Sequence, residues 1–176
     1  GRHAILFDMD GVLINTSGSY DEATRATVSD YLCAVLGLEA PCAKPSHEVL
    51  FAMKQAGGFN NDWDLTRAIL LRAIQSLNLG PAPASPDDWS AQMPSTSCAD
   101  VVTRADFLSF AKSVKEAGGG YEGARTLCGP EVESWLLGFG EVRGSNMVER
   151  IFQEQLRLDA KGGMGAVRRL PLFQQI

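Results

Sequence analysis

Two carboxylates near the start of the chain, Asp8 and Asp10, have the residue type and spacing that most directly suggest chemistry. They follow the apolar run 4–7 and precede Gly11, which permits a sharp turn. Such a short run is typical of a buried parallel strand, and ligands bind beyond the carboxyl ends of such strands. Because alternate residues of a strand point the same way, both carboxylates can face one site. The alternative is a solvated turn with two incidental acids.

The stretch 7–13 (FDMDGVL) resembles the first motif of the haloacid-dehalogenase (HAD) superfamily. The resemblance implies a Mg²⁺-dependent phosphatase-type hydrolase that cleaves a phosphorylated small molecule through an aspartyl-phosphate. In that family Asp8 is the nucleophile and Asp10 the general acid and base. The Asp8 carboxylate and the Asp10 backbone carbonyl then bind the magnesium ion.

Two further stretches, 57–64 (GGFNNDWD) and 118–123 (GGGYEG), make the resemblance closest to a poorly characterised subfamily of HAD hydrolases with a helical cap of the C1 type. It implies an α/β fold class, with a HAD-like Rossmannoid core and a large α-helical cap. Only the first core strand is evident, so the chain is mostly helical as it stands and lacks the C-terminal part of the core. The expected divisions are the first strand and its loop at 1–17, the helical cap at 18–158 and a return segment at 159–176.

The loop 57–64 holds two glycines, two amides, two acids and two aromatic residues. In HAD proteins with such a cap, loops of this kind face the active site and select the substrate. The resemblance therefore makes Lys54, Asn60 and Asn61 candidates for substrate binding. The alternative is that Asn61 or Asp62 caps the following helix, since both residue types are favoured at that position.

Apolar residues along the rest of the chain recur at helical spacing, and glycines follow several of these segments. Residues 80–99 contain four prolines and are expected to be an extended surface linker. Thr103 and Asp106 have the spacing of a capping box at the start of a helix. Helices are predicted at 20–36, 46–55, 63–77, 104–117, 121–127, 130–137 and 146–158.

The other residues of a HAD active site are not recognisable in the sequence. Asp87 and Asp88 form an acidic pair, but they follow prolines and serines in the expected linker rather than a strand. Lys112 and Lys115 lie on an expected helix and are more simply solvated. A second hypothesis is therefore a catalytically incomplete HAD-like structural subunit of a larger assembly, in which a partner chain or the missing C-terminal half of the same protein supplies the sheet. A third is a free-standing helical binding module in which Asp8 and Asp10 are incidental.

Composition describes an ordinary soluble globular protein. The chain has 176 residues, 45% of them hydrophobic and 21% charged, with a net charge of −5. No apolar run approaches the roughly 20 residues that span a bilayer, and the start of the chain has no basic leader. The acidic balance argues against a nucleic-acid partner, whereas a phosphorylated metabolite remains compatible with it.

Four widely spaced cysteines contain no C-x-x-C pair, so neither a zinc site nor a redox motif is evident: Cys33, Cys42, Cys98 and Cys128. They are expected to be reduced core thiols, which places the protein in a reducing compartment, either the cytoplasm or an organelle matrix or stroma. The chain begins with Gly1 rather than methionine, which suggests a processed or excised product.

Overall fold

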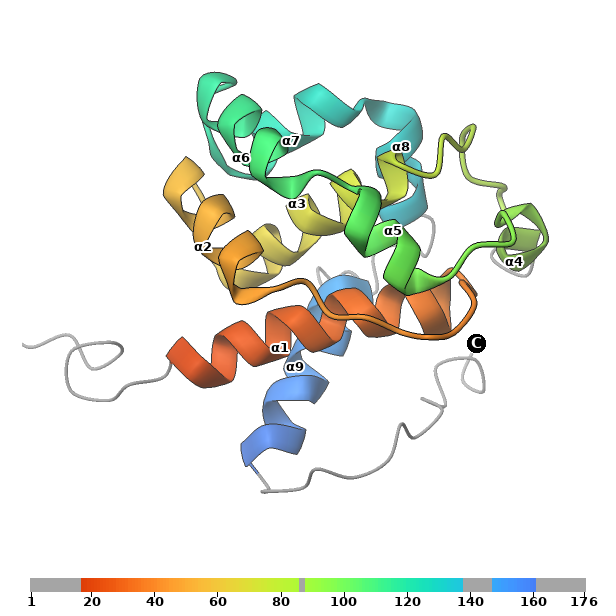
Figure 1. Cartoon of the computed structure of the whole chain (residues 1–176), viewed down its shortest axis with the longest axis horizontal. Helices are drawn as coiled ribbons and strands as arrows, with labels where there is room; N and C mark the ends of the chain where they lie inside the picture. Colours follow the sequence, from red (N-terminus) through yellow and green to blue (C-terminus); the bar gives the residue numbers. More distant parts are fainter. Residues whose placement is uncertain (1–16, 86–87, 138–146, 161–176) are drawn as a thin grey trace, which may run out of the picture.

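The computed structural model describes residues 17–85, 88–137 and 147–160, and all regular structure in these ranges is helical (Figure 1). The helices are α1 (Ser17–Asp30), continued by the π-helical turn η1 (Tyr31–Val35), α2 (His47–Ala56), α3 (Asp62–Gln75), α4 (Trp89–Gln92), α5 (Cys98–Arg104), α6 (Phe107–Glu116), α7 (Gly120–Cys128), α8 (Pro130–Leu137) and α9 (Met147–Ala160). In these ranges, β pairing is confined to an isolated parallel bridge between Glu39 and Ser97.

The expectation of an α/β fold class with a Rossmannoid core is therefore wrong for the described part of the chain, which is helical. The strand expected at 4–7 lies outside the described residues. The β-branched pair Val101 and Val102 lies in α5 rather than in a strand. Local physics explains this, because the Ser97 side chain accepts a hydrogen bond from the Asp100 backbone N–H and caps the helix there. The predicted division of the chain into a first strand with its loop (1–17), a helical cap (18–158) and a return segment (159–176) is untested and stays a prediction.

Helix α3 is the centre of the hydrophobic core. From Leu65 to Ile74 most of its residues are buried, as expected for a helix with packed neighbours on several sides. Its buried residues are Leu65, Thr66, Ala68, Ile69, Leu70, Leu71, Ala73 and Ile74. In Figure 1, α1 and α9 lie below α3, while α7 and α8 lie above it, and all four contact it. This central position fixes the side chains at the half-buried start of α3 relative to α7 and α8.

Side-chain caps set the starts of α2, α3 and α6, as Ser97 does for α5. Ser46 accepts a hydrogen bond from the backbone N–H of Val49, and Asn61 accepts one from Asp64. The predicted helices over 46–55 and 63–77 are thus confirmed to within two residues. The predicted capping box is wrong, because the Thr103 hydroxyl donates to Ala99 inside α5. Asp106 itself caps α6, in the left-handed conformation with φ +36°.

More than half of the residues described at 80–85 and 88–99 are exposed, as expected for a surface linker, but this segment also contributes Trp89 to the core. Trp89 of α4 is fully buried and meets Trp135 of α8 edge to face, with ring centroids 5.1 Å apart. The Trp135 indole also donates a 2.8 Å hydrogen bond to the Gly80 carbonyl. Prolines prevent a long helix here, but they do not prevent one large aromatic side chain from entering the core.

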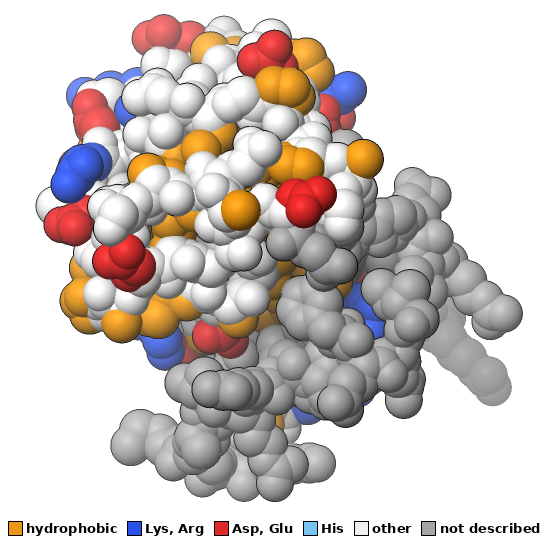
Figure 2. Space-filling model, turned by 90° about the vertical axis from the view of Figure 1, so that its right-hand side faces the viewer, with side chains coloured by type: hydrophobic (Ala, Val, Ile, Leu, Met, Phe, Trp, Pro, Cys, Tyr) orange, Lys and Arg blue, Asp and Glu red, His pale blue; other side chains and the backbone are white. Residues whose placement is uncertain are grey.

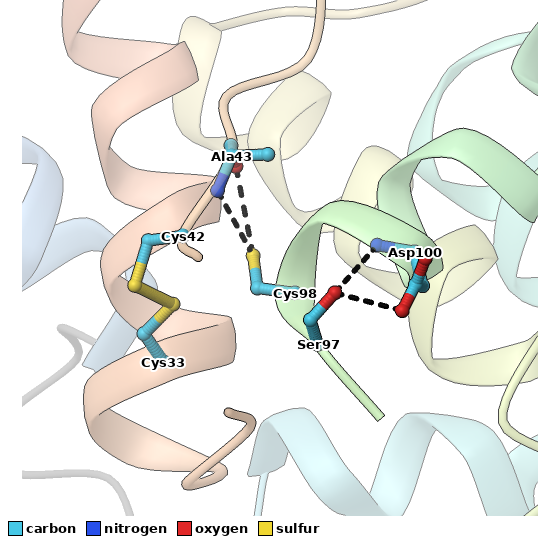
Figure 3. The surroundings of a disulfide bond; sticks show 6 residues. All are labelled: Cys33, Cys42, Ala43, Ser97, Cys98 and Asp100. Carbon is cyan, nitrogen blue, oxygen red and sulfur yellow. Dashed lines mark hydrogen bonds between the residues drawn. A yellow bond between two sulfur atoms is a disulfide. The ribbon is translucent and has the colours of Figure 1, made fainter. Parts of the chain in front are cut away.

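Two of the cysteines are joined, as Figure 3 shows, and the other two are free. Cys33 and Cys42 form a disulfide that closes the loop between η1 and α2. The Cys98 sulfur lies 3.5 Å from the backbone nitrogen of Ala43, the neighbour of Cys42. Free, buried thiols are confirmed for Cys98 and Cys128, whereas the expectation is wrong for the disulfide pair.

Acidic and basic side chains lie close together along the left edge of the face shown in Figure 2. Large hydrophobic side chains are also exposed elsewhere, and Phe51 of α2 is the most open of them at 65%. Among the described helices, none is both long and apolar enough to cross a membrane.

Candidate functional site

The sequence-derived site residues lie in different places. Asp8 and Asp10 are outside the described residues, so their assigned roles stay predictions. The Lys54 ammonium group pairs with Asp21 of α1. Asn61 caps α3, which is the alternative that its residue type suggested. Asn60 is exposed and lines a cleft that neither Lys54 nor Asn61 lines.

This cleft has a volume of about 430 Å³. Helix α3 forms one wall, α7 and the start of α8 form the other, and two glycine-containing loops lie between them. The lining residues are Gly58, Asn60, Asp64, Arg67, Gly119, Gly120, Tyr121, Glu122, Arg125 and Glu133. Apart from the three glycines, all of these side chains are polar or charged, so the cleft suits a hydrogen-bonding ligand rather than an apolar one.

Backbone contact between glycines brings the two loops together. The Gly120 N–H donates a 2.7 Å hydrogen bond to the Gly57 carbonyl oxygen. A Cβ atom on Gly120 would lie 2.3 Å from the Gly58 carbonyl oxygen, and one on Gly58 would lie 2.8 Å from the Gly120 nitrogen. Gly58 and Gly120 also have positive φ angles, of 78° and 64°. Only glycine fits this crossing, which places the start of α7 beside the start of α3.

A chain of hydrogen bonds crosses the cleft through Tyr121. Its hydroxyl accepts from Arg67 Nη2 at 2.9 Å and donates to Glu133 Oε1 at 2.9 Å. The other Glu133 oxygen accepts from Arg125 Nε at 2.7 Å. The Arg67 guanidinium also lies over the Tyr121 ring, 3.9 Å from its centroid. Glu133, only 7% exposed, thus has both oxygens occupied.

The donors of the two arginines are only partly used. Arg67 Nε is buried without a hydrogen-bond partner, and its Nη1 lies 3.8 Å from an Asp64 oxygen. Arg125 Nη1 donates to the exposed Glu122 at 3.1 Å, while its Nη2 has no partner among the described residues. A guanidinium carries five N–H donors and no acceptor. The hydrogen-bonding capacity that remains on these two side chains is therefore donor capacity.

The same contacts fix two protonation states. Burial raises the pKa of Tyr121 well above its ordinary value, and the hydrogen bond to Glu133 raises it further. Hydrogen bonds to Glu133 and Glu122 raise the pKa of Arg125. At neutral pH Tyr121 is therefore a neutral donor and Arg125 a cation. The arrangement suits binding and orientation of a ligand more than proton transfer through these two groups.

No group of three or more His, Cys, Asp or Glu side chains in the described ranges could hold a metal ion. The predicted magnesium site on Asp8 and Asp10 lies outside the described residues, and it stays a prediction.

Sequence reasoning missed the residues that give the cleft its charge. Arg67 and Arg125 sit within ordinary helical patterns, and Glu133 lies on a different helix from its partners. The usable signal was the pair of glycine-rich stretches at 57–58 and 118–120, because closely apposed backbones require glycine on both sides.

Comparison with known proteins gives one limited match. No protein-family model matches the chain, and no solved structure matches it either. A protein of Phytophthora nicotianae named imidazoleglycerol-phosphate dehydratase is 32% identical over 78 residues, or 44% of this chain. The match spans only 15% of that relative's length.

These findings contradict the HAD resemblance and what it implied. No HAD family model matches, and the relative is named as a dehydratase rather than a phosphatase. The described residues also form no β-strand of the core sheet that the family requires. The expected Mg²⁺-dependent phosphatase and its alternative, an incomplete HAD-like subunit, are therefore both wrong readings. The motif misled because 7–13 is a short pattern that the rest of the chain does not support.

Proposed function

We propose that the helical unit is a binding module for a small phosphorylated molecule, held in the cleft between α3 and α7. One observation carries this proposal: Arg67 and Arg125 line the same cleft, and neither Nη1 of Arg67 nor Nη2 of Arg125 has a hydrogen-bond partner among the described residues. Guanidinium groups match the oxygens of a phosphate in geometry as well as in charge.

Two further features support a phosphate-sized anion. The N-cap of α7, Gly119, offers no side chain to the first N–H groups of that helix, and Tyr121 and Glu122 at its start line the cleft. Helix N-termini favour anions. The volume of about 430 Å³ lies within the usual range for small-molecule sites.

The Phytophthora relative adds a candidate ligand. Its printed name refers to imidazoleglycerol phosphate, which is a phosphorylated small molecule. Because the match spans so little of that protein, we propose shared ligand chemistry and leave the dehydration reaction aside.

Isothermal titration calorimetry tests this function. Glycerol 3-phosphate and imidazoleglycerol phosphate are titrated into the 176-residue chain, with glycerol as the ligand lacking phosphate. We expect both phosphate esters to bind and glycerol not to bind. Arg125→Gln should weaken phosphate-ester binding by about tenfold, because one charge-assisted contact is lost.

Arg104→Gln is the matched control, since Arg104 is an exposed arginine near the end of a helix that does not line the cleft. Circular dichroism verifies that each variant is folded. Absence of binding by either ester at millimolar concentration would reject the function, as would equal losses in the two variants.

A further inference from the structure

Carboxylates outnumber guanidiniums in the cleft, three to two, so a simple anion site is an incomplete description. Glu133 is neutralised by hydrogen bonds from Tyr121 and Arg125. The Glu122 side chain is 77% exposed and therefore well screened by solvent. The third carboxylate, Asp64, is the one whose charge a ligand in the cleft would meet.

Asp64 has an oxygen available for a ligand. Its Oδ2 accepts a 2.9 Å hydrogen bond from the Asn61 side chain, whereas Oδ1 has only an ion pair of 3.8 Å with Arg67. The Asp64 side chain is 23% exposed, which limits screening by solvent. A phosphate bound at Arg67 would consequently lie within a few ångströms of a like charge, and such proximity is unfavourable.

A positive group on the ligand removes this conflict. Placed against Asp64, a protonated nitrogen compensates the carboxylate and supplies the hydrogen bond that Oδ1 lacks. The phosphate then retains the guanidinium donors of Arg67 and Arg125 without net repulsion from the wall of the cleft.

From this arrangement we infer that the cleft selects phosphate esters that also carry a basic nitrogen, with the nitrogen at Asp64 and the phosphate at the two arginines. The inference rests on the proposed function and specifies its ligand class. Asp64 is then the residue that determines specificity for the nitrogen-containing ligand.

Two sugar phosphates of nearly equal size test the inference. Glucosamine 6-phosphate and glucose 6-phosphate differ by one amine in place of a hydroxyl, and both are titrated below the pKa of that amine. The affinity of the native chain for glucosamine 6-phosphate should exceed its affinity for glucose 6-phosphate by about threefold or more, as expected for one partly screened ion pair. In Asp64→Asn the preference should disappear, because the amino sugar loses its partner while the phosphates of both sugars lose the same repulsion.

Asp100→Asn is a closely matched control. Like Asp64, Asp100 is the third residue of its helix and accepts a hydrogen bond from the N-cap side chain, in its case Ser97 at 2.8 Å. It does not line the cleft, so its substitution should leave the affinities for both sugars unchanged.

The outcomes separate the inference from the proposed function. Equal binding of the two sugars by the native chain overturns the inference and leaves a phosphate site intact, as does an equal effect of Asp64→Asn on both. Binding of neither sugar overturns both proposals. If Asp64→Asn fails to fold, the comparison of the two sugars on the native chain still decides the matter.

Discussion

At the scale of single residues, Tyr121 is the link between the two walls of the cleft. Its hydroxyl is acceptor for Arg67 and donor to Glu133, so one oxygen atom joins α3 to α8 through α7. Buried polar groups that satisfy one another in this way hold side chains in fixed orientations. The two arginine side chains that line the cleft are therefore held in place without a ligand being present.

Tyr121→Phe removes this hydroxyl while keeping the ring under Arg67. The buried Glu133 then loses one of two donors, and we expect the free energy of unfolding to fall by about 1–2 kcal/mol. Urea denaturation measures this loss. In a Glu133→Gln background the same substitution should cost less, and strictly additive effects would show that the two groups are not coupled.

Glu122→Gln tests whether Arg125 is available to a ligand. The pair is exposed, so its loss should change stability little. The substitution frees Arg125 Nη1, and we expect the affinity for glycerol 3-phosphate to rise by about twofold to fivefold. Glu131→Gln, on an exposed position of α8 outside the cleft, should leave it unchanged. A weaker affinity in Glu122→Gln would contradict the assignment.

At the scale of elements, helix positions were predictable and helix contacts were not. Asn61 and Pro130 mark helix starts through local chemistry that is legible in the sequence. The crossing of Gly58 and Gly120 depends on segments about 60 residues apart, and no local pattern encodes which glycines meet. Asn60 was proposed as a ligand residue only through the HAD resemblance, and no local pattern indicated that Arg125 of α7 would line the same cleft.

The glycine crossing can be probed by comparing two alanine substitutions. Gly120→Ala and Gly129→Ala both place a side chain at positive φ, which costs about 1 kcal/mol or more. A Cβ at position 129 meets nothing within 4 Å, whereas at 120 it meets the Gly58 carbonyl at 2.3 Å. Gly120→Ala should therefore destabilise the protein by about 1–3 kcal/mol more. Equal losses in denaturation experiments would argue against the close contact.

At the scale of the whole molecule, the sequence identified a helical majority but misassigned the class around it. Helical spacing predicted most of the helices after position 17, yet the short apolar run 4–7 before Asp8 led to an expected sheet and to the HAD family. A motif of a few residues is weak evidence for a family when the rest of the sequence does not predict the strands and helices that must surround it. The hydrophobic core that does form is centred on α3 and needs no sheet within the described residues.

Thiol chemistry tests this core as a whole. Burial raises the pKa of Cys128 to about 12 and also raises that of Cys98, so both thiols should be protonated and unreactive in the folded protein at pH 8. Without reductant, denatured protein should expose two reactive thiols, and reduction should expose four. Rapid labelling of the folded protein, or four thiols before reduction, would contradict the arrangement of the cysteines.

The most direct test of the proposed binding site is to map it by NMR. Backbone amide signals of the isotope-labelled chain are followed while glycerol 3-phosphate is added, with glycerol in a parallel titration. We predict that glycerol 3-phosphate shifts the signals of Gly58, Gly120, Tyr121 and Glu122, which line the cleft, and that glycerol shifts none of them. Shifts confined to another surface, such as the exposed lysine Lys112, or no shifts at all, would contradict phosphate binding in this cleft.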